Sequence, residues 1–271
     1  MTVRANVGVR PLAGRNIVIT RPREQAGQFR RLLEEAGGEV LEVPTIRIDP
    51  PESWGALDHA IGRLDDFQWL VFTSVNGVEN FRQRMATNGM DLGALARRRV
   101  AAIGPATAEA LKELGISPEV VPDEFRAEGL LERLRAHIRP GDRVLLPRAA
   151  ETRDLLVKEL GRLGADVAEV PAYRTVAVRE GAPVLRRALE SGTVDVVTFT
   201  SSSTVRHFVV MFAPREAAAL LRDVAVACIG PITAATAAEL GLTARIMPAE
   251  YTIPALARAI IEYYSKKSEK E

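Results

Sequence analysis

Short apolar runs alternate along the chain with longer segments in which apolar residues recur every three or four positions. The runs are four to six residues long and are rich in Val, Ile, Leu and Phe, whereas the longer segments span ten residues or more. These patterns are typical of buried strands and amphipathic helices respectively. Because parallel neighbours need crossover connections, the alternation predicts parallel sheets covered by helices on both faces.

One strand-to-helix phrase occurs twice. Residues 100–116 read VAAIGPATAEALKELGI and residues 226–242 read VACIGPITAATAAELGL, identical at 10 of 17 positions. Gly104 and Gly230 stand where the backbone must turn, and Pro105 and Pro231 suit the first position of a helix. Each turn is therefore expected to direct free helix amides outward from a strand end, where an anion can bind.

Other parts of the chain also repeat. Residues 16–48 correspond to residues 143–175, so that Arg21 matches Arg148 and Pro44 matches Pro171, each 127 positions further on. Residues 69–81 (WLVFTSVNGVENF) match residues 196–208 (VVTFTSSSTVRHF) at the same offset. The chain is therefore interpreted as an internal duplication of a doubly wound α/β unit with five strands. Ligands of such sheets bind beyond the carboxyl ends of the strands.

Composition limits what these turns can bind. The chain has 271 residues, of which 47% are hydrophobic and 26% charged, with a formal net charge of +1. This length suits two domains, and the near-neutral charge offers no general attraction for nucleic acid or an anionic membrane. No apolar run reaches the roughly twenty residues that a membrane span needs. A cytoplasmic protein is expected.

The sequence contains no signature of a metal or a nucleotide cofactor. Cys228 is the only cysteine and lies in an apolar run, which favours a small core residue. His59, His137 and His207 share no ligand-like spacing. Since there is also no Gly-x-Gly-x-x-Gly after a strand and no Walker A lysine, we expect no cofactor.

Five motifs in this order resemble the uroporphyrinogen-III synthase family over nearly the whole chain. They are the Arg-Pro strand end at Arg21, the Val-Phe-Thr-Ser segment ending at Ser74, the Ile-Gly-Pro-x-Thr turn ending at Thr107, the Val-Pro-x-Tyr-x-Thr segment around Tyr173, and the Tyr-Thr-Ile start of the last helix at Tyr251.

The resemblance implies two flavodoxin-like lobes joined by a two-stranded linker. One lobe would contain residues 1–48 and 174–271 and the other residues 49–173, with crossings near 44–49 and 171–176. The repeat alone would instead suggest a contiguous division near Pro140. Each proline of the crossing segments removes a ladder donor, which makes these segments poor interior strands. The charged tail from Ser265 is expected to be mobile.

The resemblance also implies an enzyme of haem, sirohaem or cobalamin biosynthesis, a hydro-lyase that closes the linear tetrapyrrole hydroxymethylbilane and inverts ring D. Its substrate carries many carboxylates, which helix N-termini and hydroxyls can bind. The candidate substrate-binding residues are Arg21, Thr73, Ser74, Val75, Asn76, Gly104, Thr107, Arg148, Ser201, Ser202, Ser203, Gly230, Pro231, Thr233, Thr252 and Ile253. The alternative role of the Ser and Thr residues is helix capping, which contributes about 1 kcal/mol each.

Tyr173 matches the tyrosine that the family places near its substrate, so it is the candidate catalytic acid. A phenol with a pKa of about 10 is protonated at neutral pH and can donate to the departing hydroxyl. The structural alternative is an aromatic residue that packs in the linker. Arg21 and Arg148 could neutralise carboxylates of the substrate or form ion pairs within the protein.

A binding or sensor protein that closes on a small anion without chemistry is the second hypothesis, since two lobes on a hinge suit that use equally well. In either case the partner is a small molecule rather than nucleic acid or a membrane. The enzyme is expected to be monomeric, with transient contact to the enzyme that supplies hydroxymethylbilane.

Overall fold

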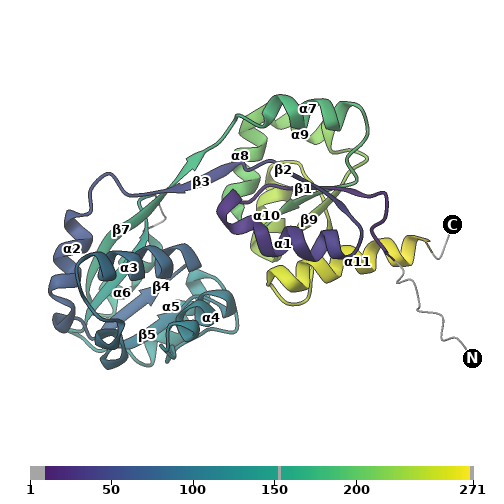
Figure 1. Ribbon diagram of the computed structural model, residues 1–271. Coiled ribbons are helices and arrows are strands. Elements are labelled where there is room, and N and C mark those ends of the chain that lie inside the picture. Colours follow the sequence, from purple (N-terminus) through teal and green to yellow (C-terminus); the bar gives the residue numbers. More distant parts are fainter. Residues whose placement is uncertain (1–9, 152–153, 269–271) are drawn as a thin grey trace, which may run out of the picture. The chain divides into compact units, whose positions relative to one another are not determined.

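The computed structural model describes residues 10–151 and 154–268. The chain divides into two compact units, unit 1 with residues 1–47 and 177–271 and unit 2 with residues 48–176 (Figure 1). The boundaries expected from the family resemblance lie one and three residues from these positions. Each unit contains a five-stranded sheet, so the fold is α/β. The pairs β1–β2, β1–β8, β8–β9, β9–β10, β4–β5, β4–β6 and β6–β7 are all parallel.

The sheet of unit 1 has the order β10-β9-β8-β1-β2. Its strands are β1 (Asn16–Ile19), β2 (Glu39–Glu42), β8 (Val196–Phe199), β9 (Ala225–Cys228) and β10 (Ala244–Ile246). In chain order this is the 2-1-3-4-5 arrangement of flavodoxin-like sheets. All four residues of both β8 and β9 are buried, because helices cover both faces.

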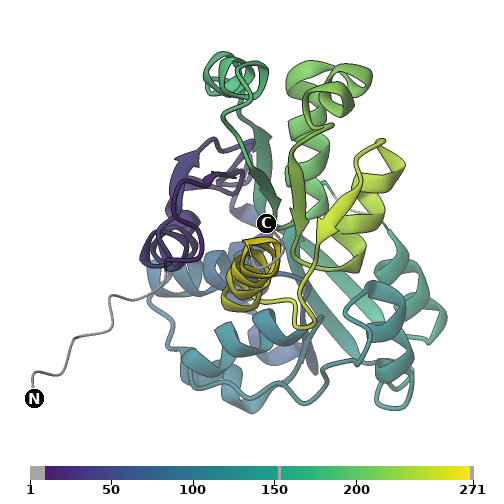
Figure 2. The same ribbon diagram turned by 90° about the vertical axis from the view of Figure 1, so that its right-hand side faces the viewer.

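The helices of unit 1 form two layers. They are α1 (Arg23–Glu35), α7 (Ala182–Glu190), α8 (Ser202–Phe212), α9 (Pro214–Leu220), α10 (Pro231–Glu239) and α11 (Ile253–Ser268). Successive residues of β1 point to opposite faces, so Ile17 and Ile19 pack with α1 and α11 while Val18 packs with α7 to α10. Figures 1 and 2 show α1 beside α11. Cys228 is fully buried, which confirms the predicted core role.

The sheet of unit 2 has the order β3-β7-β6-β4-β5. Its strands are β3 (Ile46–Asp49), β4 (Trp69–Phe72), β5 (Arg99–Ala102), β6 (Arg143–Ala149) and β7 (Asp166–Ala177). Its α-helices are α2 (Gly55–Gly62), α3 (Val75–Thr87), α4 (Pro105–Glu113), α5 (Ala127–Arg135) and α6 (Leu155–Arg162), with 3-10 turns at Leu64–Asp66 and Leu92–Arg97.

Corresponding strand pairs of the two units share one register. Asn16 pairs with Glu39 in unit 1, and Arg143 pairs with Asp166 in unit 2, both at an offset of 127. The helices between these strands end alike, because Gly37 (φ 95°) and Gly164 (φ 88°) adopt the left-handed conformation that stops a helix.

Two expectations need correction. The segment from Pro171 to Val176 is not separate from the strand before it, because β7 runs without a break through Pro171 and lies between β3 and β6. Pro171 is accommodated next to a β-bulge, where β6 pairing shifts by one residue. The charged tail does not become irregular at Ser265, because α11 continues to Ser268. Residues 269–271 lie outside the described part.

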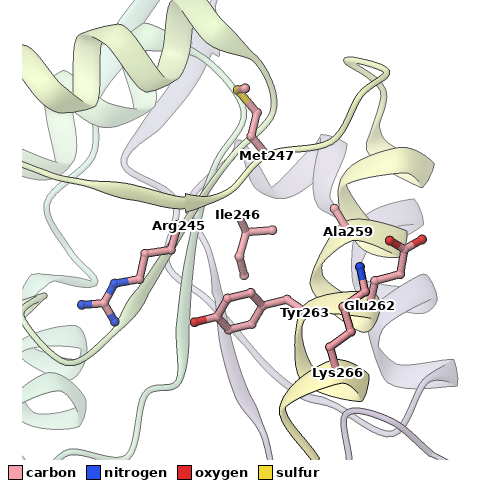
Figure 3. A pocket seen from close by; sticks show the side chains of 7 residues that line it. All are labelled: Arg245, Ile246, Met247, Ala259, Glu262, Tyr263 and Lys266. Atoms are coloured by element: carbon pink, nitrogen blue, oxygen red, sulfur yellow. The ribbon is translucent and has the colours of Figure 1, made fainter. Parts of the chain in front are cut away.

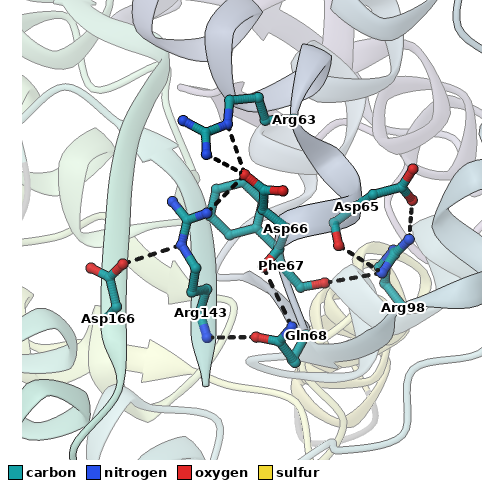
Figure 4. A network of polar contacts seen from close by, with 8 residues as sticks. All are labelled: Arg63, Asp65, Asp66, Phe67, Gln68, Arg98, Arg143 and Asp166. Carbon is teal, nitrogen blue, oxygen red and sulfur yellow. Dashed lines mark hydrogen bonds and ion pairs between the residues drawn. The ribbon is translucent and has the colours of Figure 1, made fainter. Parts of the chain in front are cut away.

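Ion pairs close the amino-terminal edge of the sheet in unit 2 (Figure 4). The guanidinium of Arg143 donates to Asp66 (2.9 Å) and Asp166 (3.2 Å), and its backbone N–H donates to Gln68 (2.8 Å). Arg98 pairs with Asp65 nearby. In these contacts each arginine is paired with a carboxylate. This edge therefore has a structural role and is not a binding site for a charged ligand.

Asp58 provides a test of how helices α2 and α3 are held together. Its carboxylate accepts two hydrogen bonds from Arg84 (both 2.5 Å) and one from Asn88 (2.8 Å), and these hydrogen bonds lower its pKa to about 2. Because the pKa of Asp58 is lower in the folded protein, its ionised carboxylate stabilises the fold at pH values above the unfolded pKa near 4. This stabilisation is lost as pH falls through about 2.

We expect Asp58→Asn to lower the free energy of unfolding at pH 7 by about 1 kcal/mol, since the pair is partly solvated. Urea denaturation from pH 7 to pH 2 measures this, and the difference from wild type should disappear towards pH 2. Asp65→Asn, at a carboxylate whose side chain is 90% exposed, is the control and should change little. A constant difference at all pH values would contradict the electrostatic explanation.

Candidate functional site

Among the helices that follow strands, the two repeated segments supply four, and these four have two kinds of N-terminus. Helices α3 and α8 are capped by serines: Ser74 Oγ accepts from Gly77 N (3.0 Å), and Ser201 forms a capping box with Thr204. Helices α4 and α10 begin at Gly104 and Gly230, where no side chain of the described residues caps them. Among these four helices, α4 and α10 are therefore the ones whose first-turn amides are left for an anion.

Gly104 and Gly230 are required by packing rather than by their backbone conformation. Their φ values are −173° and −172°, an extended geometry open to any residue. An added Cβ would lie 3.1 Å from Phe125 Cβ at Gly104 and 3.0 Å from Tyr251 Cγ at Gly230. The expectation that these turns use glycine for a tight bend is therefore wrong, because an aromatic residue of the next loop covers each turn.

Phe125 and Tyr251 were not among the predicted site residues. They occupy matching places in the repeat, FRAEGL at 125–130 and YTIPAL at 251–256, and this correspondence was the available signal. Ile232 was also missed. It is the second residue of α10 and is 49% exposed, so it presents an apolar side chain beside the free amides.

Several predicted hydroxyls are engaged within the protein. Ser202 Oγ lies 2.8 Å from Thr236 Oγ1, which itself donates to the Ile232 carbonyl (3.0 Å), and this chain ties α8 to α10. Ser203 Oγ lies 2.9 Å from Ser201 Oγ. These contacts favour the alternative in which the serines cap and hold helices, and they leave the neighbouring backbone amides as the better ligand donors.

The remaining predicted residues lie at the same strand ends or helix starts. Thr107 and Thr233 are 3% and 4% exposed and lie in the first turns of α4 and α10. Val75 is 42% exposed at the start of α3, and Pro231 is exposed at the start of α10. The others are half-buried, namely Thr73 and Asn76 before and in α3, and Thr252 and Ile253 at the start of α11. Thr252 Oγ1 accepts from Ala255 N (3.3 Å), so this hydroxyl caps α11.

A β-bulge in the pairing of β6 with β7 sets the direction in which the Tyr173 side chain points. Arg148 pairs with Pro171 and Ala149 pairs with Tyr173, so Ala172 is an extra residue on β7. Bulges re-aim side chains and are frequent beside active sites. The Tyr173 phenol reaches the first turn of α3, where its oxygen lies 2.9 Å from Ser74 Oγ.

Burial raises the pKa of Tyr173 above its usual value of 10, against smaller opposing effects of the Ser74 hydrogen bond and the Arg148 charge. The side chain is 7% exposed. The phenol is therefore protonated throughout the neutral range, as a proton donor must be.

The two predicted arginines have different surroundings. Arg148 is 3% exposed at its side chain, and its Nε lies 2.7 Å from Glu169 Oε1. Arg21 has no ion pair within the described residues, and its Nη2 donates a long hydrogen bond to Gln25 Oε1 (3.4 Å). Burial lowers the pKa of Arg21 to about 10, and the guanidinium still carries its charge at neutral pH.

Two cavities of unit 1 lie away from these residues. One of about 420 Å³ lies beside β10 and α11 and is lined by Arg245, Tyr263 and Lys266 among others (Figure 3). The other, of about 550 Å³, adjoins Arg15 and Asp195 at the amino-terminal edge of the sheet. No predicted site residue lines either cavity, so neither is taken as the candidate site.

Two parallel-sheet units, each with an uncapped helix N-terminus at its carboxyl edge, are typical of α/β proteins that bind small anionic molecules. Residues 27–258 match the family model described as uroporphyrinogen-III synthase HemD. The chain belongs to the uroporphyrinogen-III synthase family, whose members are enzymes of tetrapyrrole biosynthesis.

Individual relatives agree with this assignment. The chain is 36% identical over 258 residues to uroporphyrinogen-III synthase of Synechococcus elongatus, covering 93% of this chain and 97% of the relative. It is 28% identical over 250 residues to the enzyme of Chlorobaculum parvum, covering 92% and 98%. The fold is similar to a crystal structure of mutant uroporphyrinogen III synthase from Thermus thermophilus, with a TM-score of 0.70, 22% identity and coverage of 95% and 100%. Within residues 10–151 and 154–268, no helix has the length and apolarity to cross a membrane.

The packing of Tyr251 on Gly230 can be tested by adding one methyl group. We expect Gly230→Ala to lower the free energy of unfolding by about 1 to 3 kcal/mol, because the tyrosine ring must move away from the new Cβ. Urea denaturation measures the effect. Gly27→Ala is the matched control, since nothing lies within 4 Å of its Cβ in the middle of α1, and it should stabilise the protein slightly. Equal effects of the two substitutions would contradict the packing argument.

Proposed function

We propose that this protein cyclises hydroxymethylbilane with loss of water and inversion of ring D, giving uroporphyrinogen III. Family membership supports the reaction. The observation that carries the mechanism is the 2.9 Å contact between the Tyr173 phenol and Ser74 Oγ, at the carboxyl edge of the unit 2 sheet. A buried, protonated phenol at the start of a helix can supply the proton that the departing hydroxyl requires.

Substrate carboxylates are bound in this proposal by backbone amides rather than by a basic surface. The amides of the first turns of α4 and of α10 are the donors that each unit offers by itself, and the helix dipoles favour negative charge there. Ile232 and Val75 supply exposed apolar surface beside such turns, suited to the faces of pyrrole rings. The Ser202 hydroxyl contributes by fixing the position of α10 through Thr236.

Departure of the hydroxyl is the step in which Tyr173 acts. The C–O bond breaks with electron supply from the pyrrole ring, and the Tyr173 proton leaves with the oxygen as water. Ser74 Oγ already accepts from Gly77 N, so its own proton is free to point to the Tyr173 oxygen and to stabilise the developing phenolate. For inversion, the electrophilic methylene carbon first bonds to the α-carbon of ring D that already carries the bridge to ring C. The bond from that α-carbon to the bridge then breaks, and the freed methylene bonds to the other α-carbon of ring D. Loss of the proton from this last carbon completes the product and restores the phenol.

The reaction is tested by incubating the purified protein with freshly prepared hydroxymethylbilane and separating the oxidised products. We expect mostly the type III isomer, in the presence of a chelator and without added cofactor. A protein that only binds anions would leave the ratio of type I to type III equal to that of the control without protein. Size-exclusion chromatography of the same sample tests the proposed monomer, and cell fractionation tests the proposed cytoplasmic location.

Replacing Tyr173 tests the proton donor. We expect Tyr173→Phe to slow turnover by at most 10²- to 10⁴-fold, roughly 3 to 5 kcal/mol, while the product stays mostly type III because positioning is retained. The raised pKa keeps the phenol protonated, so the wild-type rate should show no loss from tyrosine ionisation between pH 7 and 9.

Tyr264→Phe is the matched control for this experiment. It removes another buried tyrosine hydroxyl, one that donates to the Asp195 carbonyl at the opposite edge of the unit 1 sheet, and turnover should be unchanged. A full rate in Tyr173→Phe would exclude Tyr173 as the acid.

A further inference from the structure

Arg21 and Arg148 occupy equivalent positions but have opposite electrostatic surroundings. Arg21 follows β1 and Arg148 lies in the last part of β6, both at the carboxyl edge, and strands β1 and β6 pair with β2 and β7 in the same register. In unit 2, Arg148 Nε pairs with Glu169 at 2.7 Å. The residue equivalent to Glu169 in unit 1 is Glu42, 127 positions earlier, so the same acid is available to Arg21.

Glu42 is engaged elsewhere. Its carboxylate accepts from Arg30 Nη1 at 3.3 Å, and Arg30 lies on the outer part of α1 with a side chain that is 49% exposed. The position equivalent to Arg30 in unit 2 is Val157, which cannot compete for Glu169. Arg30, which also pairs with Glu34 at 2.7 Å, is therefore the cation that contacts Glu42 in unit 1, whereas Arg148 contacts Glu169 in unit 2.

Arg21 is left as a half-buried cation that has no counter-charge among the described residues. Within the described residues it forms no ion pair, and its Nε is buried with no hydrogen-bond partner. Such a charge destabilises a fold unless something else compensates it. Burial lowers the pKa of Arg21 to about 10, with no carboxylate opposing the effect.

The surroundings of Arg21 are rigid and electropositive. Thr20 Oγ1 donates to the Thr198 carbonyl (2.6 Å), and Thr45 Oγ1 donates to the Thr20 (3.3 Å) and Thr204 (3.1 Å) carbonyls, so buried threonines fix the strand end before Arg21. The pairing of Ile19 with Thr198 places Arg21 level with Thr200, just before the N-terminus of α8. The helix dipole adds positive potential to that of the guanidinium.

We infer that Arg21 is the charge-specific anchor for one carboxylate of the substrate, and that Arg30 keeps it available by holding Glu42 away. The inference rests on the proposed function, because it takes the ligand to be a polycarboxylate tetrapyrrole. Arg148 has the other role: it is an internal ion-pair partner that supports the strand carrying Tyr173. In this proposal Arg21 binds the substrate, whereas Arg148 at the equivalent position has a structural role.

The direct test compares Arg21→Met with Arg148→Met. Loss of a charge-assisted hydrogen bond should raise KM for hydroxymethylbilane roughly ten- to a hundredfold in Arg21→Met, with a smaller change in kcat. Its urea midpoint should stay equal or rise, because an uncompensated buried charge is removed. Arg148→Met should lower the urea midpoint, since it leaves Glu169 without its partner.

The indirect test leaves Arg21 untouched. Arg30→Val introduces the unit 2 residue and frees Glu42, which should then pair with Arg21 and raise KM about three- to tenfold. Arg30→Val with Glu42→Gln should restore the wild-type KM, because the freed side chain no longer carries charge. A role of Arg30 in stability alone would not be reversed by the second substitution.

A titration with uroporphyrin III, a stable polycarboxylate, measures binding affinity without turnover. Quenching of the uroporphyrin fluorescence reports the bound fraction. If wild type produces no type III product, the proposed function fails, and this titration still decides the role of Arg21. Weaker binding in Arg21→Met together with rescue of Arg30→Val by Glu42→Gln supports the inference. Unchanged binding in Arg21→Met, or failure of the rescue, overturns it, and the Arg30 variants decide alone if Arg21→Met does not fold.

Discussion

Parallel pairing of the strands is the constraint on which the rest of this structure depends. Every strand that pairs in parallel must be reached by a crossover, so the carboxyl ends of the strands and the starts of the following helices collect at one edge of each sheet. Helix N-termini that lack side-chain caps, at Gly104 and Gly230, then lie at the same edge as the polar strand ends. The capacity to bind an anion follows from this topology before any side chain is considered.

The two edges of the unit 1 sheet differ in whether their positive charges are paired with carboxylates. At the amino-terminal edges, arginines meet carboxylates: Arg143 bonds Asp66 and Asp166 in unit 2, and Arg15 bonds Asp195 (2.9 Å) in unit 1. At the carboxyl edge of unit 1, Arg21 and the amides of α10 have no such match among the described residues. Paired charges stabilise an edge, whereas uncompensated positive potential is a cost that binding of an anion can offset.

Positions 127 residues apart in the two units differ in their partners more than in their strand pairing. The strand registers agree, yet Tyr173 in unit 2 corresponds to Ile46 in unit 1, and Gly77 in α3 corresponds to Thr204 in α8. Each difference changes one contact: the phenol reaches Ser74, and Thr204 completes a capping box that Gly77 cannot form. A repeated backbone can therefore carry a proton donor in one unit and a carboxylate anchor in the other, as proposed above.

Much of the fold could be predicted from the sequence because it depends on residues close together in the chain. Apolar runs, the Gly-Pro turns and the stops at Gly37 and Gly164 specify strands, helix starts and helix ends locally, and these elements have the predicted types in the structure. The family motifs likewise drew attention to Tyr173 and to the four helix starts, although the roles proposed for these residues await the experiments described above.

Only the tertiary structure decided which groups meet. The rings of Phe125 and Tyr251 explain the glycine caps, the bulge at Ala172 directs Tyr173, and Thr236 engages the hydroxyl of Ser202. Likewise, Glu42 contacts Arg30 of α1 in unit 1, whereas Glu169 contacts Arg148 in unit 2. The sequence by itself determined the order and type of the helices and strands. It also determined the pattern of apolar residues that sets strand register, since these features follow from local periodicity. The sequence did not determine which side chains contact one another, because the competing side chains come from separate elements that meet only when the chain has packed.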